Sequence, residues 1–123
     1  MATGWSLSIG YNSGYSYNGD DQEAWDELVR VTKKLCEHPE RIEAEAYAYG
    51  APLADPNGET LFSYCERYRE QQGGTITINQ DQRVIHQIAS GDRAMKEYVR
   101  RAFCRLILQD MHRLNIEVNL IVA

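Results

Sequence analysis

The first segment of the chain alternates between apolar and small polar residues over positions 5–11. This period of two is typical of a β-strand with one apolar face, and it predicts a strand here. The apolar positions are Trp5, Leu7, Ile9 and Tyr11. The overlapping stretch IGYNSGYSYNG, residues 9–19, is rich in glycine, asparagine and serine. We interpret it as a loop that joins this strand to a helix.

Two longer segments have the spacing of amphipathic helices. Apolar residues recur at intervals of three and four over residues 22–36 and over residues 91–114, which places them on one helical face. Asp20 and Glu23 are spaced like a capping box at the start of the first helix, and Ser90 is the predicted N-cap of the second. The sequence HPE at 38–40 ends the first helix, because proline cannot continue the hydrogen-bond ladder.

Residues 42–49 alternate strictly between two sets of side chains. One set is Ile42, Ala44, Ala46 and Ala48, and the other is Glu43, Glu45, Tyr47 and Tyr49. This pattern predicts a strand whose alanine face lies under a helix. Glu43 and Glu45 would then share the opposite face of the strand, roughly 7 Å apart.

The rest of the chain predicts three further elements. Residues 60–72 fit either a helix opened by Thr60 or a strand, and we favour the helix. The sequences TITI and RVIHQI flank the polar sequence NQDQ at 79–82, which predicts a β-hairpin with a four-residue loop. After Asn115 ends the second long helix, residues 116–122 predict a last, buried strand.

The order of these elements indicates a fold class. Helices separated by single strands and one hairpin favour an α+β two-layer sandwich of the ferredoxin-like type. Its sheet would be mixed or antiparallel, with both main helices on one face. A chain of 123 residues with 43% apolar and 25% charged residues suits a single domain over residues 1–123.

Composition also indicates a compartment. The longest apolar runs, LIL and LIVA, are far shorter than the ~20 residues of a membrane-spanning helix. The N-terminal ten residues lack the basic and apolar regions of a signal peptide. Three cysteines, an odd number at wide spacing, favour reduced thiols over a disulfide framework. We therefore expect a cytoplasmic protein that does not associate with membranes.

The motifs of familiar enzymes are not matched. The sequence GYSYNG lacks the glycine spacing of the G-x-S-x-G nucleophile elbow, and the chain contains neither a P-loop nor a dinucleotide-binding glycine motif. Zinc-binding patterns such as C-x-x-C and H-E-x-x-H are also missing, so Cys36 and His38 would need distant ligands to hold a metal. We expect no metal, no cofactor and no enzymatic activity.

Charge is distributed unevenly along the chain. The net charge of −5 comes from 18 acidic and 13 basic residues, which argues against nucleic-acid binding. Residues 1–60 contain 11 acidic and 4 basic residues, a net −7, whereas residues 61–123 contain 7 and 9, a net +2. Such an acidic half can pair with the basic half of the same chain, pair with that of a second copy in a homodimer, or face a basic surface of another protein.

The first functional hypothesis is a non-enzymatic protein-binding module of the inhibitor, immunity or adaptor type. Tyrosine supplies contact area at low entropic cost, and acidic side chains supply complementarity to a basic partner surface. The residues expected at this interface are Tyr15, Tyr17, Asp20, Asp21, Glu43, Glu45, Tyr47 and Tyr49.

The second hypothesis is an oligomeric protein that binds or sequesters a nucleotide-like anion. The ligand would lie between the 11–19 segment and the basic side of the second long helix, where Glu97 and Arg101 are also spaced for an ion pair. The residues expected to bind it are Tyr11, Asn12, Ser13, Arg93, Arg100 and Arg101.

The third hypothesis is an enzyme without a familiar motif. His86 lies on a predicted strand and would act as a general base if Glu43 or Glu45 lay beside it in the sheet.

Overall fold

The computed structural model describes residues 5–10, 13–17, 22–71, 74–88, 91–116 and 119–122. The strands are β1 (Trp5–Gly10), β2 (Ser13–Tyr17), β3 (Ile76–Asn79), β4 (Val84–Gln87) and β5 (Asn119–Val122). The helices are α1 (Gln22–Cys36), α2 (Pro39–Ala48), α3 (Leu61–Glu66), the short 3-10 helix Arg67–Arg69 and α4 (Arg93–Arg113). Within these ranges, no helix has the length and apolar content needed to cross a membrane.

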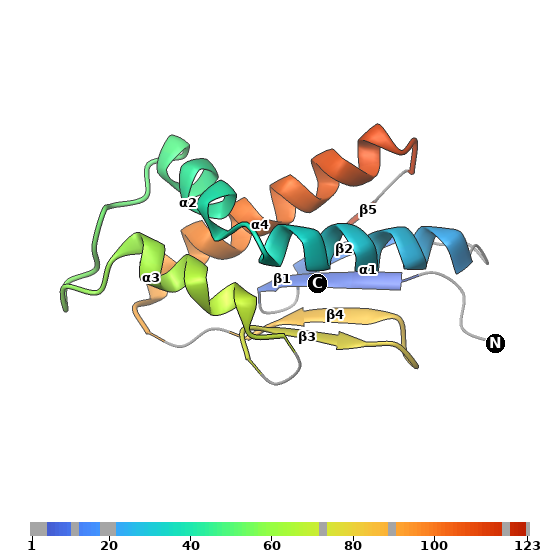
Figure 1. Ribbon diagram of the computed structural model, residues 1–123, viewed down its shortest axis with the longest axis horizontal. Coiled ribbons are helices and arrows are strands. Elements are labelled where there is room, and N and C mark those ends of the chain that lie inside the picture. Colours follow the sequence, from blue (N-terminus) through green and yellow to red (C-terminus); the bar gives the residue numbers. More distant parts are fainter. Residues whose placement is uncertain are drawn as a thin grey trace.

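The strands form one mixed sheet in the order β3-β4-β1-β2-β5 (Figure 1). β1 pairs in parallel with β4, while the pairs β1–β2, β2–β5 and β3–β4 are antiparallel. In the register of the sheet, Ile85 lies opposite Leu7 on one side and Ile78 on the other. All three side chains are buried, so they form an apolar row across the sheet.

One face of the sheet is covered by helices. The side chains of Trp5, Leu7 and Ile85 are buried, whereas His86, the next residue after Ile85, is exposed. α1 and α4 lie along the covered face, and α2 and α3 lie at one end, on the left in Figure 1. The predicted α+β two-layer sandwich with a mixed sheet is therefore confirmed.

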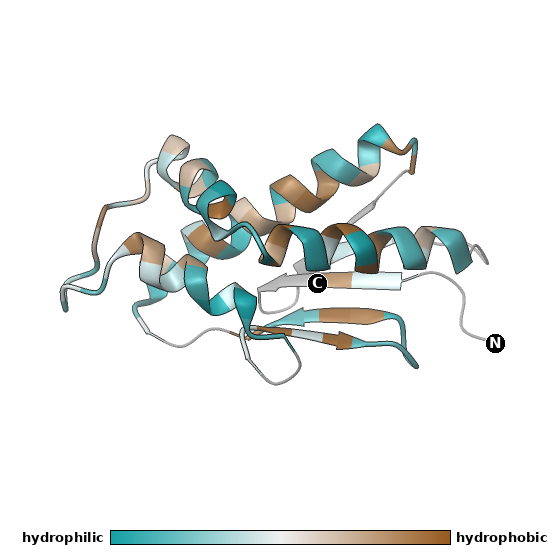
Figure 2. Cartoon of the chain, viewed as in Figure 1, coloured by the Kyte–Doolittle hydropathy of each residue, from teal (hydrophilic) through white to brown (hydrophobic). Residues whose placement is uncertain are grey.

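The core lies between the helices and the sheet. Apolar and polar residues form alternating bands along α1 and α4 (Figure 2), as expected for helices that bury one side. At the centre of the core, the rings of Tyr68 and Phe103 stack with their centroids 4.8 Å apart. The buried side chains of α1 and α4 include Trp25, Leu28, Leu35, Val99, Phe103, Ile107 and Met111.

The prediction of a strand over residues 42–49 is wrong, because residues 42–48 belong to helix α2 and Tyr49 is its C-cap. Pro39 occupies the first turn of α2, where its missing N–H removes no helical hydrogen bond. Ile42 and Ala46, four residues apart, are buried, whereas Ala44 is exposed. Alanine and glutamate are both strong helix formers. The alternation along the sequence therefore does not correspond to a buried and an exposed face. The buried side chains, Ile42 and Ala46, are instead spaced by four residues, as on one face of a helix.

The opening stretch also differs from the prediction, because it contains a second strand. β2 pairs with β1 so that Tyr15 lies opposite Leu7, and the two strands form a hairpin that precedes α1. Together with the helical segment 42–48, this hairpin changes the element order from that of the ferredoxin-like type. From its sequence alone, a segment rich in glycine and serine resembles a loop. Here β2 lies between β1 and β5 and pairs with both, which holds it in the sheet.

The other elements agree with the sequence. α1 has the predicted bounds, the helix favoured for residues 60–72 is present, and β3 and β4 form the expected hairpin. α4 begins two residues later than predicted, because the Asp92 carboxylate accepts a hydrogen bond from the N–H of Met95 at 3.0 Å. The prediction of Ser90 as the N-cap of this helix is therefore wrong, because Asp92 is the N-cap. The predicted cap Asp20 lies outside the described residues. Asn115 ends α4 with a left-handed φ of 59°.

Candidate functional site

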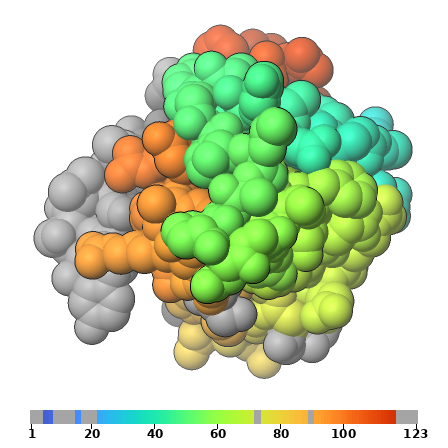
Figure 3. All heavy atoms as spheres, turned by 90° about the vertical axis from the view of Figure 1, so that its left-hand side faces the viewer, coloured from blue at the N-terminus to red at the C-terminus, as the bar shows by residue number. Residues whose placement is uncertain are grey.

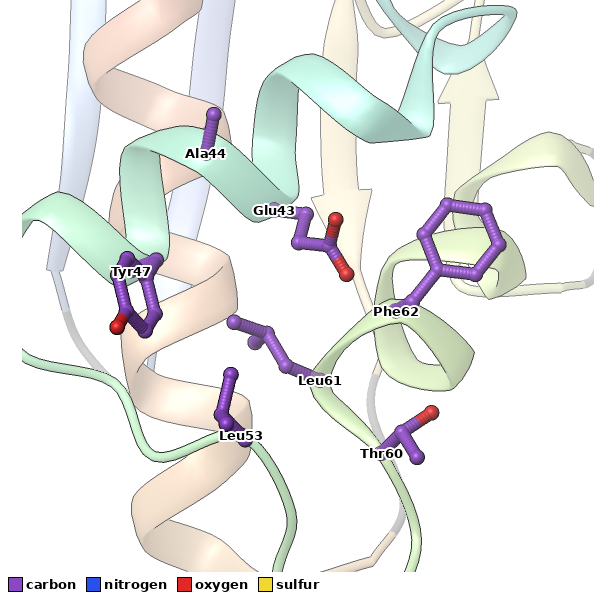
Figure 4. Close-up of a pocket in the computed structure, with 7 residues that line it drawn as sticks. All are labelled: Glu43, Ala44, Tyr47, Leu53, Thr60, Leu61 and Phe62. Atoms are coloured by element: carbon purple, nitrogen blue, oxygen red, sulfur yellow. The ribbon is translucent and has the colours of Figure 1, made fainter.

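A groove opens between α2, α3 and the segment that joins them. It has a volume of about 450 Å³, and Figure 4 shows its lining side chains, which puts it within the range of about 300–1,000 Å³ that small-ligand pockets occupy. The lining residues are Glu43, Ala44, Tyr47, Leu53, Thr60, Leu61 and Phe62.

Local sequence explains how two of these side chains reach the groove. Glu43 and Tyr47 are four residues apart on α2, so they lie on the same side of the helix. The opposite wall is the first turn of α3, where Thr60 caps the helix by accepting a hydrogen bond from the N–H of Ser63 at 3.2 Å. Leu61 and Phe62 follow this cap directly. In Figure 4 the side chain of Leu61 points toward Tyr47 and Leu53, whereas the ring of Phe62 lies on the other side of Glu43.

The third wall is the segment 49–60, which is held by a buried carboxylate. Asp55 accepts hydrogen bonds from the N–H groups of Asn57 and Glu59, both at 2.9 Å. It also accepts a hydrogen bond from the hydroxyl of Tyr64 at 2.7 Å, and that hydroxyl accepts one from the N–H of Asp92 at 2.8 Å. These bonds tie the segment to α3 and to the start of α4.

This network lowers the pKa of Asp55. The hydrogen bond from Tyr64 is the largest cause, and the two backbone N–H groups act in the same direction. For Tyr64, burial is the largest cause of a raised pKa, followed by its hydrogen bond to Asp55. The network therefore stabilises Asp55 as a carboxylate and Tyr64 as a neutral hydroxyl.

Three large apolar side chains around the groove are exposed. The exposed fractions are 58% for Tyr47, 71% for Leu53 and 40% for Phe62. Single exposed apolar residues are common, but several around one depression are typical of a binding surface. Figure 3 views this end of the molecule and shows α2, the 49–60 segment and α3 forming one continuous surface.

Glu43 is the only formally charged residue among those that line the groove. It makes no hydrogen bond or ion pair with any residue in the described ranges. Neighbouring acidic residues are paired, because Glu59 binds Arg67 and Glu66 binds Arg69, the latter at 2.9 Å. The groove therefore combines apolar walls with one carboxylate that has no partner within the described chain.

The four residues predicted to share one acidic-aromatic face divide between two sides of α2. Glu43 and Tyr47 line the groove, whereas Glu45 and Tyr49 contact α4. The Nε atom of Arg105 donates a hydrogen bond to Glu45 at 3.2 Å, and its guanidinium carbon lies 3.6 Å from the centre of the Tyr49 ring. Glu45 and Tyr49 thus take part in packing α2 against α4.

The remaining predicted interface residues lie near the N-terminal hairpin. Tyr15 packs against the core, and burial is the largest cause of its raised pKa. The backbone of Tyr17 is in β2, while Asp20 and Asp21 lie outside the described residues.

The residues predicted to bind an anion are brought together only in part. Arg100 and Arg101 both pair with Glu97, at 3.2 and 3.7 Å, and Arg93 is exposed at the start of α4. The predicted ion pair between Glu97 and Arg101 is thereby confirmed. The backbone of Ser13 is in β2, and Tyr11 and Asn12 lie outside the described residues.

The arrangement proposed for an enzyme is not formed. His86 is exposed on β4, on the side of the sheet away from the buried Ile85. Glu43 and Glu45 belong to α2 in the helical layer, so neither acid lies beside His86. Among the described residues, no cluster of three or more histidine, cysteine or acidic side chains could hold a metal ion.

Sequence analysis missed Leu53, Thr60, Leu61 and Phe62 as site residues. One signal was present: Phe62 falls between the buried positions Leu61 and Tyr64 of α3, so a helix would leave it exposed. Leu53 is likewise an apolar residue in a loop segment that contains prolines. Neither signal shows that these residues meet Tyr47, because this depends on how α2 and α3 pack.

Comparisons of the chain with protein-family models, with curated proteins and with solved structures found no match.

Proposed function

We propose that this chain is a non-enzymatic protein-binding module that acts by covering a surface of a partner protein. The observation that carries this proposal is the exposed apolar rim of the groove between α2 and α3, formed by Tyr47, Leu53 and Phe62. Burying large apolar and aromatic side chains is the main source of binding energy at protein interfaces. The acidic character of the chain supports a partner with a basic surface.

The construction of the groove supports the same proposal. The Asp55 hydrogen bonds hold the 49–60 segment in place before any partner arrives. A surface that is already ordered loses less conformational entropy on binding, and this favours affinity. Inhibitor, immunity and adaptor proteins all act by such stoichiometric contact, so the proposal covers this whole class.

The test compares capture of a partner by two matched variants. Phe62→Ser removes an apolar side chain from the groove, and Leu114→Ser removes one with the same exposed fraction, 40%, at the end of α4. Each protein, immobilised at equal density, is incubated with lysate of the cells that make it, and bound proteins are quantified by mass spectrometry. We expect a partner that Leu114→Ser retains and Phe62→Ser loses. Equal retention by both variants would contradict the proposal.

A second candidate function is binding of a nucleotide-like anion at α4. It is favoured by the Nε atom of Arg100 and the Nη2 atom of Arg105, which are buried and have no hydrogen-bond partner in the part of the chain that the structure describes. The oxygen atoms of an anion would satisfy such donors. The charges of Arg105 and Arg101 also act on Tyr15 in β2, where they oppose the effect of burial on its pKa.

Thermal unfolding with added ATP or inorganic phosphate tests this second candidate. Binding to the folded state raises Tm as the ligand concentration increases. We expect Arg100→Ala to lose this increase and Arg113→Ala, at the far end of α4, to keep it. A Tm that does not respond to either anion would exclude the candidate.

We also propose a cytoplasmic location. Cys36, Cys65 and Cys104 are all free and buried, and free thiols are typical of proteins in reducing compartments. Recovery of the protein from an oxidising compartment by cell fractionation would contradict this proposal.

A further inference from the structure

The groove contains one carboxylate among apolar side chains. Glu43 projects from α2 toward α3, and Leu61, Phe62 and Leu53 lie around the same depression (Figure 4). The two arginines that follow α3, Arg67 and Arg69, pair with other acidic residues and not with Glu43. Arg67 pairs with Glu59 and also lies over the ring of Tyr64, 4.4 Å from its centre, and Arg69 pairs with Glu66.

This arrangement limits what can occupy the groove. A purely apolar occupant would remove water from the Glu43 carboxylate without replacing its hydrogen bonds, which is unfavourable. A lone cation would pair with Glu43 but leave the exposed surfaces of Leu53 and Phe62 in water. An occupant that satisfies both requirements carries an apolar group and a cation side by side.

We propose that the groove binds a peptide segment of the partner protein in which a large apolar side chain stands beside a lysine or arginine. The apolar side chain enters the depression between Tyr47, Leu53 and Phe62, and the cation pairs with Glu43. This inference rests on the proposed protein-binding function and names the chemistry of the partner. The negative charge of the chain further favours a basic segment by increasing its rate of association.

The dimensions of the surface favour a protein segment over a small molecule. Tyr47 and Leu53 remain more than half exposed, so the apolar area extends beyond the depression itself. Such a surface also contacts the peptide residues on either side of the side chain that enters the depression. Apolar anchors in a preformed groove are a recurring mode of peptide recognition.

Synthetic peptides provide the test. Each probe is about 12 residues long, short enough to act as one linear recognition motif, and carries a single phenylalanine in a serine–alanine background. Lysine, glutamine or glutamate is placed in turn at each of the four positions after the phenylalanine. Binding to the ¹⁵N-labelled protein is followed by NMR, with chemical shifts of residues around Glu43 and Phe62 as the readout.

We expect the best lysine peptide to bind roughly tenfold more tightly than its glutamate counterpart, as one charge-assisted hydrogen bond would give. Glu43→Gln should abolish this preference. Asp81→Asn, which removes one acidic residue from the exposed β3–β4 turn, should leave it unchanged. The preference should also decrease as salt is added, because salt screens exposed charges.

Each other outcome overturns the inference. Equal binding of lysine and glutamate peptides at the groove would reject the charge requirement. Absence of any shift at the groove would reject peptide binding there. Self-association of the free protein that Phe62→Ser abolishes would assign the groove to a second copy. The capture experiment with Phe62→Ser and Leu114→Ser tests the proposed protein-binding function independently of the peptides. A failure of that function can therefore be distinguished from a failure of this inference.

Discussion

The guanidinium group of Arg105 on α4 lies over the ring of Tyr49, which follows α2, with 3.6 Å between its central carbon and the ring centre. The same side chain donates a hydrogen bond to Glu45. Arg105 therefore joins two residues of the α2 region that lie on the side away from the groove. This contact helps to fix the orientation of α2, and with it the positions of Glu43 and Tyr47.

Replacing Arg105 should loosen this packing. Arg105→Ala removes the contact with Tyr49 and the ion pair with Glu45, and we expect the free energy of unfolding to fall by about 1–2 kcal/mol. Arg105→Lys keeps the charge but lacks the planar group that stacks on the ring, so we expect an intermediate loss. Urea denaturation measures both values. Arg101→Ala, which removes a more exposed arginine of the same helix, serves as the control and should change stability by less than about 0.5 kcal/mol.

Gly91 should not tolerate a side chain. Its φ of +106° is unfavourable for other residues, and an added Cβ would lie 2.6 Å from the hydroxyl oxygen of Tyr64. We expect Gly91→Ala to lower the free energy of unfolding by roughly 2–3 kcal/mol, through backbone strain and displacement of Tyr64. Gly58 has a φ of +86° but open space around the added atom, so Gly58→Ala should show the strain alone, about 1 kcal/mol. Thermal unfolding measures the loss of stability in each variant. Equal losses of stability in Gly91→Ala and Gly58→Ala would show that the contact with Tyr64 has no effect.

Asp55 should make stability depend on acid pH. Its pKa is lower in the folded protein than in the unfolded chain, chiefly because of the Tyr64 hydroxyl. The stabilisation is therefore complete above the unfolded value, about pH 4, and is lost as the pH falls through the lower folded value. We expect Asp55→Asn to be less stable than the wild type near neutral pH.

The difference between Asp55→Asn and the wild type should shrink as the pH falls below about 4. Urea unfolding at a series of pH values measures it. Asp81→Asn is the matched control, because Asp81 is exposed. A difference between Asp55→Asn and the wild type that stays constant with pH would contradict the assigned role of the carboxylate.

The three cysteines should be unreactive in the folded protein. Burial is the largest cause that raises the pKa of Cys36 and of Cys65, each to about 12, and burial also raises the pKa of Cys104. Because the thiolate is the reactive form, we expect almost no alkylation by iodoacetamide at about pH 8. Intact mass should show three added groups only after denaturation. Rapid modification of one thiol in the native state would indicate an exposed thiolate and contradict this prediction.

The sequence by itself determined those helices and strands whose pattern of apolar residues fits only one type of secondary structure. The apolar stripe of α1 recurs only at the helical spacing, so its bounds, Gln22–Cys36, were predicted correctly. The β3–β4 hairpin was predicted because β-branched residues flank a polar turn. In these elements, the local conformational propensity and the pattern of buried positions favour the same secondary structure, so residues close together in the sequence are enough to specify it.

Only the tertiary structure decided the conformation of residues 39–48 and the position of the groove. An alternation of alanine and glutamate fits a strand as well as a helix, and packing of Ile42 and Ala46 against the core selected the helix. That choice separated Glu43 from Glu45 and turned Glu43 and Tyr47 toward Leu53 and the start of α3. Residues distant along the chain meet only when helices pack, because burial of apolar area depends on the whole arrangement and not on local spacing.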